Sequence, residues 1–312
     1  MINSDINGNR NILLRKYWRY IVRIHKFIAE CGVCSRRAAE ELIRNGEITV
    51  NGRPAYIGQE IDPERDRVTY GKKRLRIKVC DKQYFIFYKP RGVITSMKAQ
   101  DDRSVVADLI RGIKGRVFPV GRLDRDSEGI LILTDDGDLA QALSHPKTHV
   151  PKTYRVTISG DVSENQLNIL RSGVTLDDDT VTLPADVVVH SRTESKTVLY
   201  VTLYEGKNRQ IRRMCDSLGL NILLLKRISV GEISIGRMKP GEYRPLSRSE
   251  LEKLFNSAGL PLPSFKSKEM KEKNENRSKV RKKSENRGTR NERRFNKQMI
   301  KYSRDIKKQG KR

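Results

Sequence analysis

The sequence of 312 residues has few cysteines and no long apolar run. Its four cysteines, at positions 31, 34, 80 and 215, are too few and too scattered for the disulfide scaffold of a small secreted protein. This usage indicates a reducing, cytoplasmic setting. No apolar stretch approaches the roughly 18 residues that a membrane-spanning helix requires, so we expect no membrane anchor. The shortages argue against disulfide-rich secreted proteins and membrane-spanning proteins.

The sequence also lacks the usual residue patterns of metal-binding and nucleotide-binding sites. Cys31 and Cys34 form a CxxC pair, but a structural zinc site needs a second pair of ligands, and the other two cysteines stand alone. The acidic segment that begins at Asp135 starts like a calcium loop, yet Pro146 occupies the position where such a loop needs Glu. No GxxxxGK[ST] motif and no strand-linked GxGxxG motif occurs. We therefore expect no metal and no nucleotide cofactor.

Acidic residues are scarce relative to basic ones. Sixty-four Lys and Arg residues against thirty-eight Asp and Glu residues leave a net charge of +26, which favours a polyanionic partner, most often nucleic acid. Residues 261–312 contain twenty basic and six acidic residues, so they carry +14 and residues 1–260 carry the remaining +12. Residues 257–312 are predicted to form a disordered basic tail, because they have too few aliphatic side chains to offset the entropy of ordering. Residues 1–23 form a basic N-terminal extension.

Length and hydrophobic periodicity indicate two folded domains between these basic ends. Residues 24–80 begin with helical spacing, Ser35 can cap a second helix, and Asn51-Gly52 marks a tight turn in a short β segment. This order predicts a small αα-β domain. Residues 81–256 contain more strand-like than helical segments, without regular alternation, so we expect a larger α+β domain with a mixed, mainly antiparallel sheet.

The small domain resembles the S4 RNA-binding domain. The resemblance is carried by residues 27–43, with Ser35-Arg36-Arg37 at the start of the second helix, and by the following residues 46–52. It implies that four basic residues face RNA phosphates: Arg36, Arg37, Lys26 and Arg53. Guanidinium groups at a helix start suit this task, since they form charge-assisted hydrogen bonds with phosphate. The alternative is a solvated basic face of a structural module.

The chemistry of the larger domain concentrates in the loop of residues 121–129, which joins two apolar segments predicted to be buried strands. Three carboxylates, those of Asp124, Asp126 and Glu128, lie within five residues of each other. Such a group could provide a general acid and a general base. It could equally be solvated or paired with Arg122 and Arg125, and the spacing alone leaves both possibilities open.

This loop and several other segments resemble the RNA pseudouridine synthases, in particular the branch that carries an S4 domain and acts on ribosomal RNA. The matching segments are residues 121–124 with 127–137, residues 88–93, residues 145–147 with 152–154, residues 205–214 and residues 240–246. The resemblance spans roughly residues 24–256. It implies an isomerase that converts a uridine to pseudouridine in ribosomal RNA or a pre-ribosomal particle, with no cofactor.

The resemblance also implies roles for individual residues. Asp124 matches the catalytic aspartate, which assists at the ribose while the bond between C1′ and uracil N1 breaks and the base rejoins through C5. A carboxylate suits this step because an anion can attack or stabilise an electron-poor sugar. Arg212 matches the basic residue paired with that aspartate, and Tyr154 matches the tyrosine that stacks on the flipped base. Ile211 matches an aliphatic residue that packs at the site, and we expect it to contact RNA. Arg122 matches the residue that enters the RNA helix.

The substrate and some alternatives stay open at this point. The His145-Pro146-Lys147 stretch and the long basic tail look more like the members that modify large-subunit ribosomal RNA, and small-subunit RNA is the alternative. A non-catalytic RNA-binding or ribosome-assembly protein is a second interpretation. A hydrolase that uses Asp124 and Glu128 as paired carboxylates is a third. A monomer is the default expectation.

Overall fold

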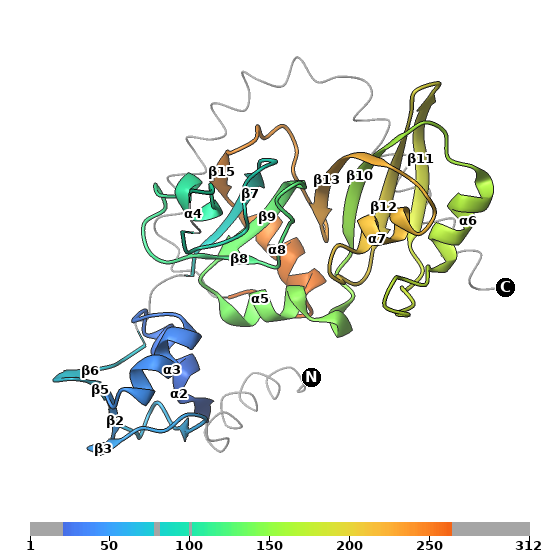
Figure 1. Cartoon of the computed structure of the whole chain (residues 1–312). Coiled ribbons are helices and arrows are strands. Elements are labelled where there is room, and N and C mark those ends of the chain that lie inside the picture. Colours follow the sequence, from blue (N-terminus) through green and yellow to red (C-terminus); the bar gives the residue numbers. More distant parts are fainter. Residues whose placement is uncertain (1–20, 78–81, 100–101, 264–312) are drawn as a thin grey trace, which may run out of the picture. The chain divides into compact units, whose positions relative to one another are not determined.

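The computed structural model describes residues 21–77, 82–99 and 102–263 (Figure 1). Residues 264–312 of the predicted tail (257–312) and residues 1–20 of the predicted N-terminal extension (1–23) lie outside the described residues. Within the ranges that are described, no helix is both long enough and apolar enough to cross a bilayer.

The small domain packs two helices beside short antiparallel strands. Its elements are β1 (Val22–Arg23), α2 (Ile24–Glu30), α3 (Arg36–Arg44), β2 (Ile48–Val50), β3 (Arg53–Pro54), β4 (Glu60–Ile61), β5 (Val68–Tyr70) and β6 (Lys73–Arg74). The strands pair in the order β3-β2-β5-β6, while β1 pairs with β4. The expected two helices followed by strands are confirmed, and the short strand β1 precedes them.

Local sequence signals account for the shape of the small domain. The Oγ atom of Ser35 accepts a hydrogen bond of 3.1 Å from the backbone N–H of Ala38, so Ser35 caps α3 as predicted. Asn51 and Gly52 have φ angles of 54° and 83°, the left-handed pair that a tight hairpin turn requires. Phe27 of α2 is buried in the apolar core that the helices share with the sheet.

The larger domain is built on a nine-stranded sheet. Its strands are β7 (Tyr84–Lys89), β8 (Phe118–Val120), β9 (Glu128–Thr134), β10 (Lys152–Ser159), β11 (Asp186–Thr193), β12 (Lys196–Leu203), β13 (Ile222–Val230), β14 (Ile233–Ser234) and β15 (Tyr243–Pro245). The main order is β11-β12-β10-β13-β9-β7-β15, with β14 on β13 and β8 on β9. These strands pair antiparallel except β9 and β13, which run parallel, so the predicted mixed and mainly antiparallel sheet is confirmed.

In the described part of the larger domain, five α-helices and one 3-10 turn accompany these strands. They are α4 (Val106–Leu109), α5 (Gly137–Ser144), η1 (Pro146–Thr148), α6 (Glu164–Ser172), α7 (Gln210–Asp216) and α8 (Arg248–Ser257). Ser163 and Gln166 form a capping box at the start of α6, and Ser247 with Glu250 forms another at α8. In both boxes a serine is followed three positions later by an acidic or amide residue, which is the sequence pattern of this cap.

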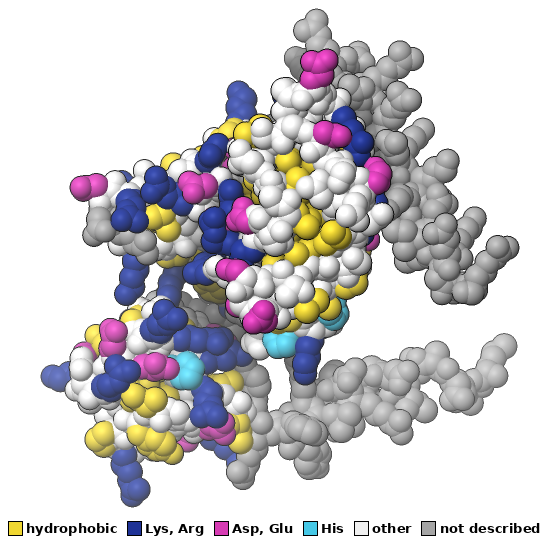
Figure 2. Space-filling model, turned by 45° about the vertical axis from the view of Figure 1, so that its right-hand side comes forward, with side chains coloured by type: hydrophobic (Ala, Val, Ile, Leu, Met, Phe, Trp, Pro, Cys, Tyr) yellow, Lys and Arg dark blue, Asp and Glu magenta, His cyan; other side chains and the backbone are white. Residues whose placement is uncertain are grey.

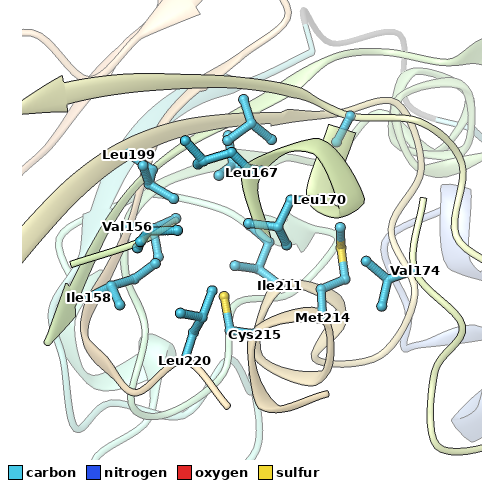
Figure 3. Close-up of a cluster of buried hydrophobic side chains, with 14 of the residues drawn as sticks. Val156, Ile158, Leu167, Leu170, Val174, Leu199, Ile211, Met214, Cys215 and Leu220 are labelled. Carbon is cyan, nitrogen blue, oxygen red and sulfur yellow. The ribbon is translucent and has the colours of Figure 1, made fainter. Parts of the chain in front are cut away.

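Helices α6 and α7 pack against an apolar face of strands β10 to β12 (Figure 3). Leu167 and Leu170 come from α6, while Ile211, Met214 and Cys215 come from α7 at the spacing that puts them on one side of a helix. Burial of these side chains fixes the position of α7 on the sheet. The polar face of the same helix is thereby oriented away from the core.

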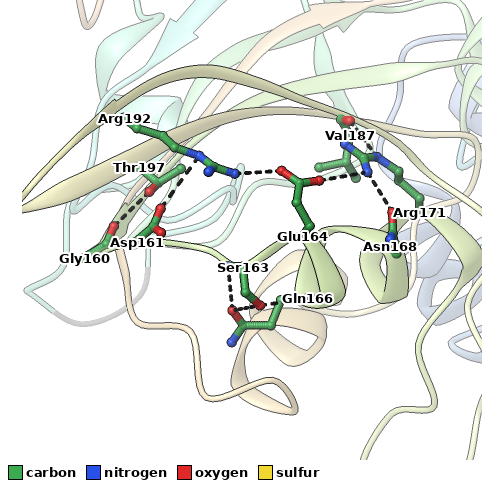
Figure 4. A network of polar contacts seen from close by, with 10 residues as sticks. All are labelled: Gly160, Asp161, Ser163, Glu164, Gln166, Asn168, Arg171, Val187, Arg192 and Thr197. Atoms are coloured by element: carbon green, nitrogen blue, oxygen red, sulfur yellow. Dashed lines mark hydrogen bonds and ion pairs between the residues drawn. The ribbon is translucent and has the colours of Figure 1, made fainter.

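A polar network fastens α6 at its outer surface (Figure 4). The carboxylate of Glu164 lies 3.0 Å from the Nη2 atom of Arg192 on β11 and 3.9 Å from the Nη1 atom of Arg171. The Nε atom of Arg171 in turn donates to the backbone carbonyl of Val187, at 3.1 Å. Arg192 also pairs with Asp161. These contacts tie the helix to the strand edge beside the core.

The parallel junction of β9 and β13 lies in the middle of the sheet. It consists of two residue pairs, Lys226 with Glu128 and Arg227 with Gly129. A Cβ atom at Gly129 would lie 2.1 Å from the carbonyl oxygen of Arg227, and Gly129 has a φ of 118°. The close approach of the two backbones therefore requires glycine at this position. Since β9 begins here, the preceding loop emerges at the junction.

Candidate active site

The loop of residues 121–127 is held by contacts with the segment that follows β7. The Oγ1 atom of Thr95 donates to the carbonyl of Leu123 at 2.7 Å and accepts from its N–H at 3.2 Å. The N–H of Gly92 donates to the carbonyl of Arg125 at 2.7 Å. Leu123 itself is buried. Asp124, between these fixed points, keeps its side chain 33% exposed.

Helix α7 and Arg209, the residue immediately before it, bring two guanidinium groups to Asp124. The Nη1 atom of Arg209 lies 3.8 Å from the Oδ2 atom of Asp124, and the Nε atom of Arg212 lies 3.9 Å from the same oxygen. These residues are far apart in the sequence, and the packing of α7 on the sheet brings them together. The expected pairing of Asp124 with Arg212 is present, and Arg209 joins it.

The guanidinium group of Arg212 is anchored by the loop that carries Asp124. The Nη2 atom of Arg212 donates to the carbonyl of Asp126 at 3.2 Å and to the Oγ atom of Ser127 at 3.3 Å. The side chain of Arg212 is 15% exposed, and its buried Nε atom has no hydrogen-bond partner within the described part of the chain. The carboxylate of Asp124, which faces two guanidinium groups, can act as a nucleophile or stabilise positive charge that develops on a substrate.

Tyr154 lies in the central part of the same sheet. It is half-buried on β10 and packs against the core under α7. Its partner across the sheet is Arg227 of β13, which in turn pairs with Gly129 at the end of the Asp124 loop. Arg122, at the start of the loop, is exposed. Both residues thus belong to the surroundings of Asp124, although no direct contact joins either of them to that carboxylate among the residues that the structure describes.

Ile211 was expected to contact RNA, but its side chain is buried in the core. Its side chain is 5% exposed and packs in the core with Met214 and Cys215. The reason is its position on α7, where it shares the inner side of the helix with these two residues while Arg212 points to Asp124. Ile211 supports the helix that carries Arg212 and has almost no surface to offer RNA.

The basic residues expected to face RNA in the small domain have different surroundings. Arg36 and Arg37, in the first turn of α3, are exposed, as is Arg53 on β3. Lys26 of α2 is half-buried and lies 3.6 Å from the carboxylate of Glu30, one turn along the same helix. Figure 2 shows numerous Lys and Arg side chains on the visible face of each domain.

Lys89, at the end of β7, is a residue of the site for which the sequence predicted no role. Its side chain is fully buried, and its Nζ atom donates to the carbonyl of Pro90 at 2.8 Å and approaches that of Arg125 at 3.5 Å. Burial lowers its pKa to about 8, while the charges of Asp124, Asp126 and Glu128 oppose this effect. The sequence shows a lysine that ends an apolar strand immediately before proline, inside the matching segment of residues 88–93.

We expect the stability conferred by Lys89 to rise between about pH 8 and pH 10.5. The pKa of this lysine is lower in the folded protein than its ordinary value of 10.5. Between the two values the unfolded chain binds more protons at this group, so raising the pH favours folding. Across this window, the free energy of unfolding of the wild type should gain up to about 3 kcal/mol relative to Lys89→Met.

Urea unfolding of the wild type and Lys89→Met at pH 7.5, 9 and 10.5 measures this difference. The exposed Lys98 supplies a control, because Lys98→Met removes the same group from the surface. A difference between wild type and Lys89→Met that stays constant over the pH range would show that the buried ammonium does not carry the effect.

Comparison with known proteins gives two family matches. Residues 83–217 match the family described as RNA pseudouridylate synthase, and residues 22–66 match the S4 domain. The first match contains Asp124, Tyr154 and Arg212, and the second contains Arg36 and Arg37.

Relatives match over most of the chain. An uncharacterized RNA pseudouridine synthase of Aquifex aeolicus is 38% identical over 77% of this chain and 96% of its own length. The ribosomal large subunit pseudouridine synthase B of Bacillus subtilis is 36% identical over 74% of this chain and 95% of its own. The dual-specificity RNA pseudouridine synthase RluF of Escherichia coli is 34% identical over 79% and 84%. A crystal structure of a pseudouridylate synthase, 32% identical, covers 75% of this chain and 99% of that one, with a TM-score of 0.54.

Proposed function

This chain belongs to the RNA pseudouridine synthase family, and we propose that it converts one or a few uridines of large-subunit ribosomal RNA to pseudouridine, with Asp124 as the catalytic residue. The observation that carries the proposal is the meeting of the Asp124 carboxylate with Arg212, whose Nε atom lies 3.9 Å from Oδ2. Asp124 lies in a loop held by backbone contacts and Arg212 on a helix packed against the sheet, so the pair is organised before RNA binds.

The proposed reaction moves one glycosidic bond from nitrogen to carbon. The bond between C1′ and N1 of the uridine breaks with assistance from the anionic Asp124 at the sugar. The free uracil turns, and a bond forms between C1′ and C5. The hydrogen on C5 leaves as a proton and N1 gains one, so the product is an isomer of the substrate. Arg212 holds the carboxylate in place throughout.

We propose that Tyr154 stacks on the flipped base and that Arg122 occupies the position that the base leaves. A uridine that leaves a stack needs a flat apolar partner, and the half-buried ring of Tyr154 on β10 can provide one. The exposed guanidinium of Arg122 can stack in the position that the base vacates. Both roles place RNA against the face that carries the loop of residues 121–127.

Large-subunit ribosomal RNA is the substrate that we propose, with the protein acting as a monomer in the cytoplasm on free RNA or a pre-ribosomal particle. The name of the Bacillus subtilis relative supports this choice, because that protein is described as a large-subunit enzyme. The His145-Pro146-Lys147 segment, in which His145 caps the turn η1 after α5, agrees with the same branch.

Tritium release from the C5 position of uridine tests this function. Large-subunit and small-subunit ribosomal RNA transcripts, each labelled with [5-³H]uridine, are incubated separately with the purified protein. We expect release from the large-subunit transcript that levels off at one or a few equivalents per molecule. Release from the small-subunit transcript alone would reverse the assignment of the substrate, and release from neither would contradict the proposed reaction.

We expect the double variant Arg36→Gln, Arg37→Gln to bind RNA about ten- to a hundredfold more weakly at moderate salt. Removal of each phosphate-binding charge should also reduce the slope of log K against log salt by about 0.7 to 0.9. The rate at saturating RNA should change little, because both residues lie outside the larger domain. The matched control is Arg44→Gln, Arg65→Gln, which removes two exposed charges from the same domain. Equally weakened binding in the two double variants would indicate a general charge effect in place of phosphate binding by Arg36 and Arg37.

A further inference from the structure

Two guanidinium groups share one carboxylate oxygen in the site, and only one of them is fixed. Arg212 is 15% exposed and is held by the Asp126 carbonyl and the Ser127 hydroxyl. Arg209 is 46% exposed, and its contact among the described residues is the ion pair with Asp124 at 3.8 Å. That distance is too long for a hydrogen bond, and exposed pairs of this kind are weak.

The backbone that carries Arg209 is, by contrast, firmly held. Its φ of 47° is a left-handed conformation that non-glycine residues adopt rarely, and such residues cluster at functional sites. The buried Gln210 fixes the turn, since its Oε1 atom accepts from the N–H of Lys207 at 3.0 Å and its Nε2 atom donates to Glu205 at 2.7 Å. The side chain of Arg209 is therefore exposed and weakly held, while its backbone is fixed.

An RNA phosphate next to the reacting uridine would approach this guanidinium. A phosphate can engage both edges of an arginine in charge-assisted hydrogen bonds, which are stronger than a long ion pair in water. Arg209 faces solvent and is joined to Asp124 only by the long pair of 3.8 Å, so its guanidinium can turn from the carboxylate to such a phosphate.

We propose that Arg209 is an exchangeable partner of Asp124, which leaves the carboxylate and binds an RNA phosphate beside the target uridine when RNA enters the site. This inference rests on the proposed function, because it assumes that RNA occupies this face. In the free protein both guanidinium groups face Asp124. In the complex Arg212 stays, and Asp124 is left with one cationic neighbour. Substrate binding thereby increases the negative charge available at the reacting sugar.

A double-mutant cycle on RNA affinity tests the exchange. The wild type, Asp124→Asn, Arg209→Gln and the double variant are titrated with a large-subunit ribosomal RNA transcript at several salt concentrations. We expect Asp124→Asn to tighten binding three- to tenfold when Arg209 is present, because the guanidinium is no longer shared. In the Arg209→Gln background the gain should be twofold or less. Arg209→Gln alone should weaken binding about tenfold and reduce the salt slope by about 0.7 to 0.9.

Two further variants separate this exchange from simpler effects. Arg125→Gln removes the same charge from an exposed position next to Asp124, and Asp124→Asn should have equal effects with and without it. Arg209→Lys keeps the charge and should restore most of the salt slope. The exchange is contradicted if Asp124→Asn has the same effect in the wild-type and Arg209→Gln backgrounds, or if Arg209→Gln leaves the salt slope unchanged. Urea unfolding midpoints confirm that each variant is folded.

The outcome is independent of whether the proposed reaction occurs. Tritium release by the wild type tests the function, and the coupling between positions 124 and 209 tests the exchange. Release without coupling would overturn the exchange alone. Coupling without release would overturn the proposed function and leave a phosphate-binding role for Arg209.

Discussion

We expect Asp124→Asn to lower the rate of pseudouridine formation by at least about a thousandfold, while the protein binds RNA at least as tightly as the wild type. The amide has nearly the same shape as the carboxylate but carries no negative charge, so it can neither attack the ribose nor stabilise positive charge there. The loop is held by backbone contacts of Leu123 and Arg125, which this substitution does not touch. The loss should therefore appear in the chemical step.

Single-turnover conversion with excess enzyme measures that step directly. Asp126→Asn is the matched control, because Asp126 is an exposed carboxylate two residues further along the same loop. We expect the control to retain its rate within about tenfold. An Asp124→Asn variant that keeps its rate, or an equal loss in both variants, would remove Asp124 from the centre of the reaction.

Gly129→Ala should destabilise the larger domain by at least about 3 kcal/mol. The added Cβ atom would meet the backbone oxygen, nitrogen and carbon of Arg227 at 2.1, 2.7 and 2.9 Å, and backbone atoms cannot move aside as a flexible side chain can. The φ of 118° adds the strain of a conformation that L side chains avoid. Because β9 and β13 pair through only two residue pairs, relief of the clash would open their junction.

Urea unfolding of the variant measures the loss, and Gly121→Ala provides the comparison. Gly121 also has a positive φ, 70°, but a Cβ atom there would have no neighbour within 4 Å among the described residues. We expect only the backbone strain, on the order of 1 kcal/mol, at this position. Equal losses at Gly121 and Gly129 would show that the approach of Arg227 contributes nothing beyond that strain.

Local features of the fold could be predicted from the sequence because they depend on neighbouring residues. Ser35, Ser163 and Ser247 cap helices where their spacing indicated, and Asn51 begins a left-handed turn. The apolar segments on both sides of the Asp124 loop form the strands β8 and β9. Each of these outcomes is decided within a few residues by a hydrogen bond, a φ angle or an alternation of apolar side chains.

Other features depend on contacts between distant segments and could not be predicted in this way. The parallel junction of β9 and β13 is set by the packing of the whole sheet, and only then is the small size of Gly129 explained. Lys89 has the sequence position of a polar strand end, yet its ammonium is fully buried. The pairing of Asp124 with Arg212 was implied by the family resemblance and not by spacing. The pairing of Asp124 with Arg209 was not predicted at all.

Mapping pseudouridines in the ribosomal RNA of cells tests the central claim most directly. Cells that lack this protein are complemented with the wild type or with Asp124→Asn, and every uridine of both ribosomal RNAs is scored. We predict that one or a few discrete large-subunit positions are modified with the wild type and unmodified with the variant at equal protein level. Identical modification maps in the two strains would contradict the account.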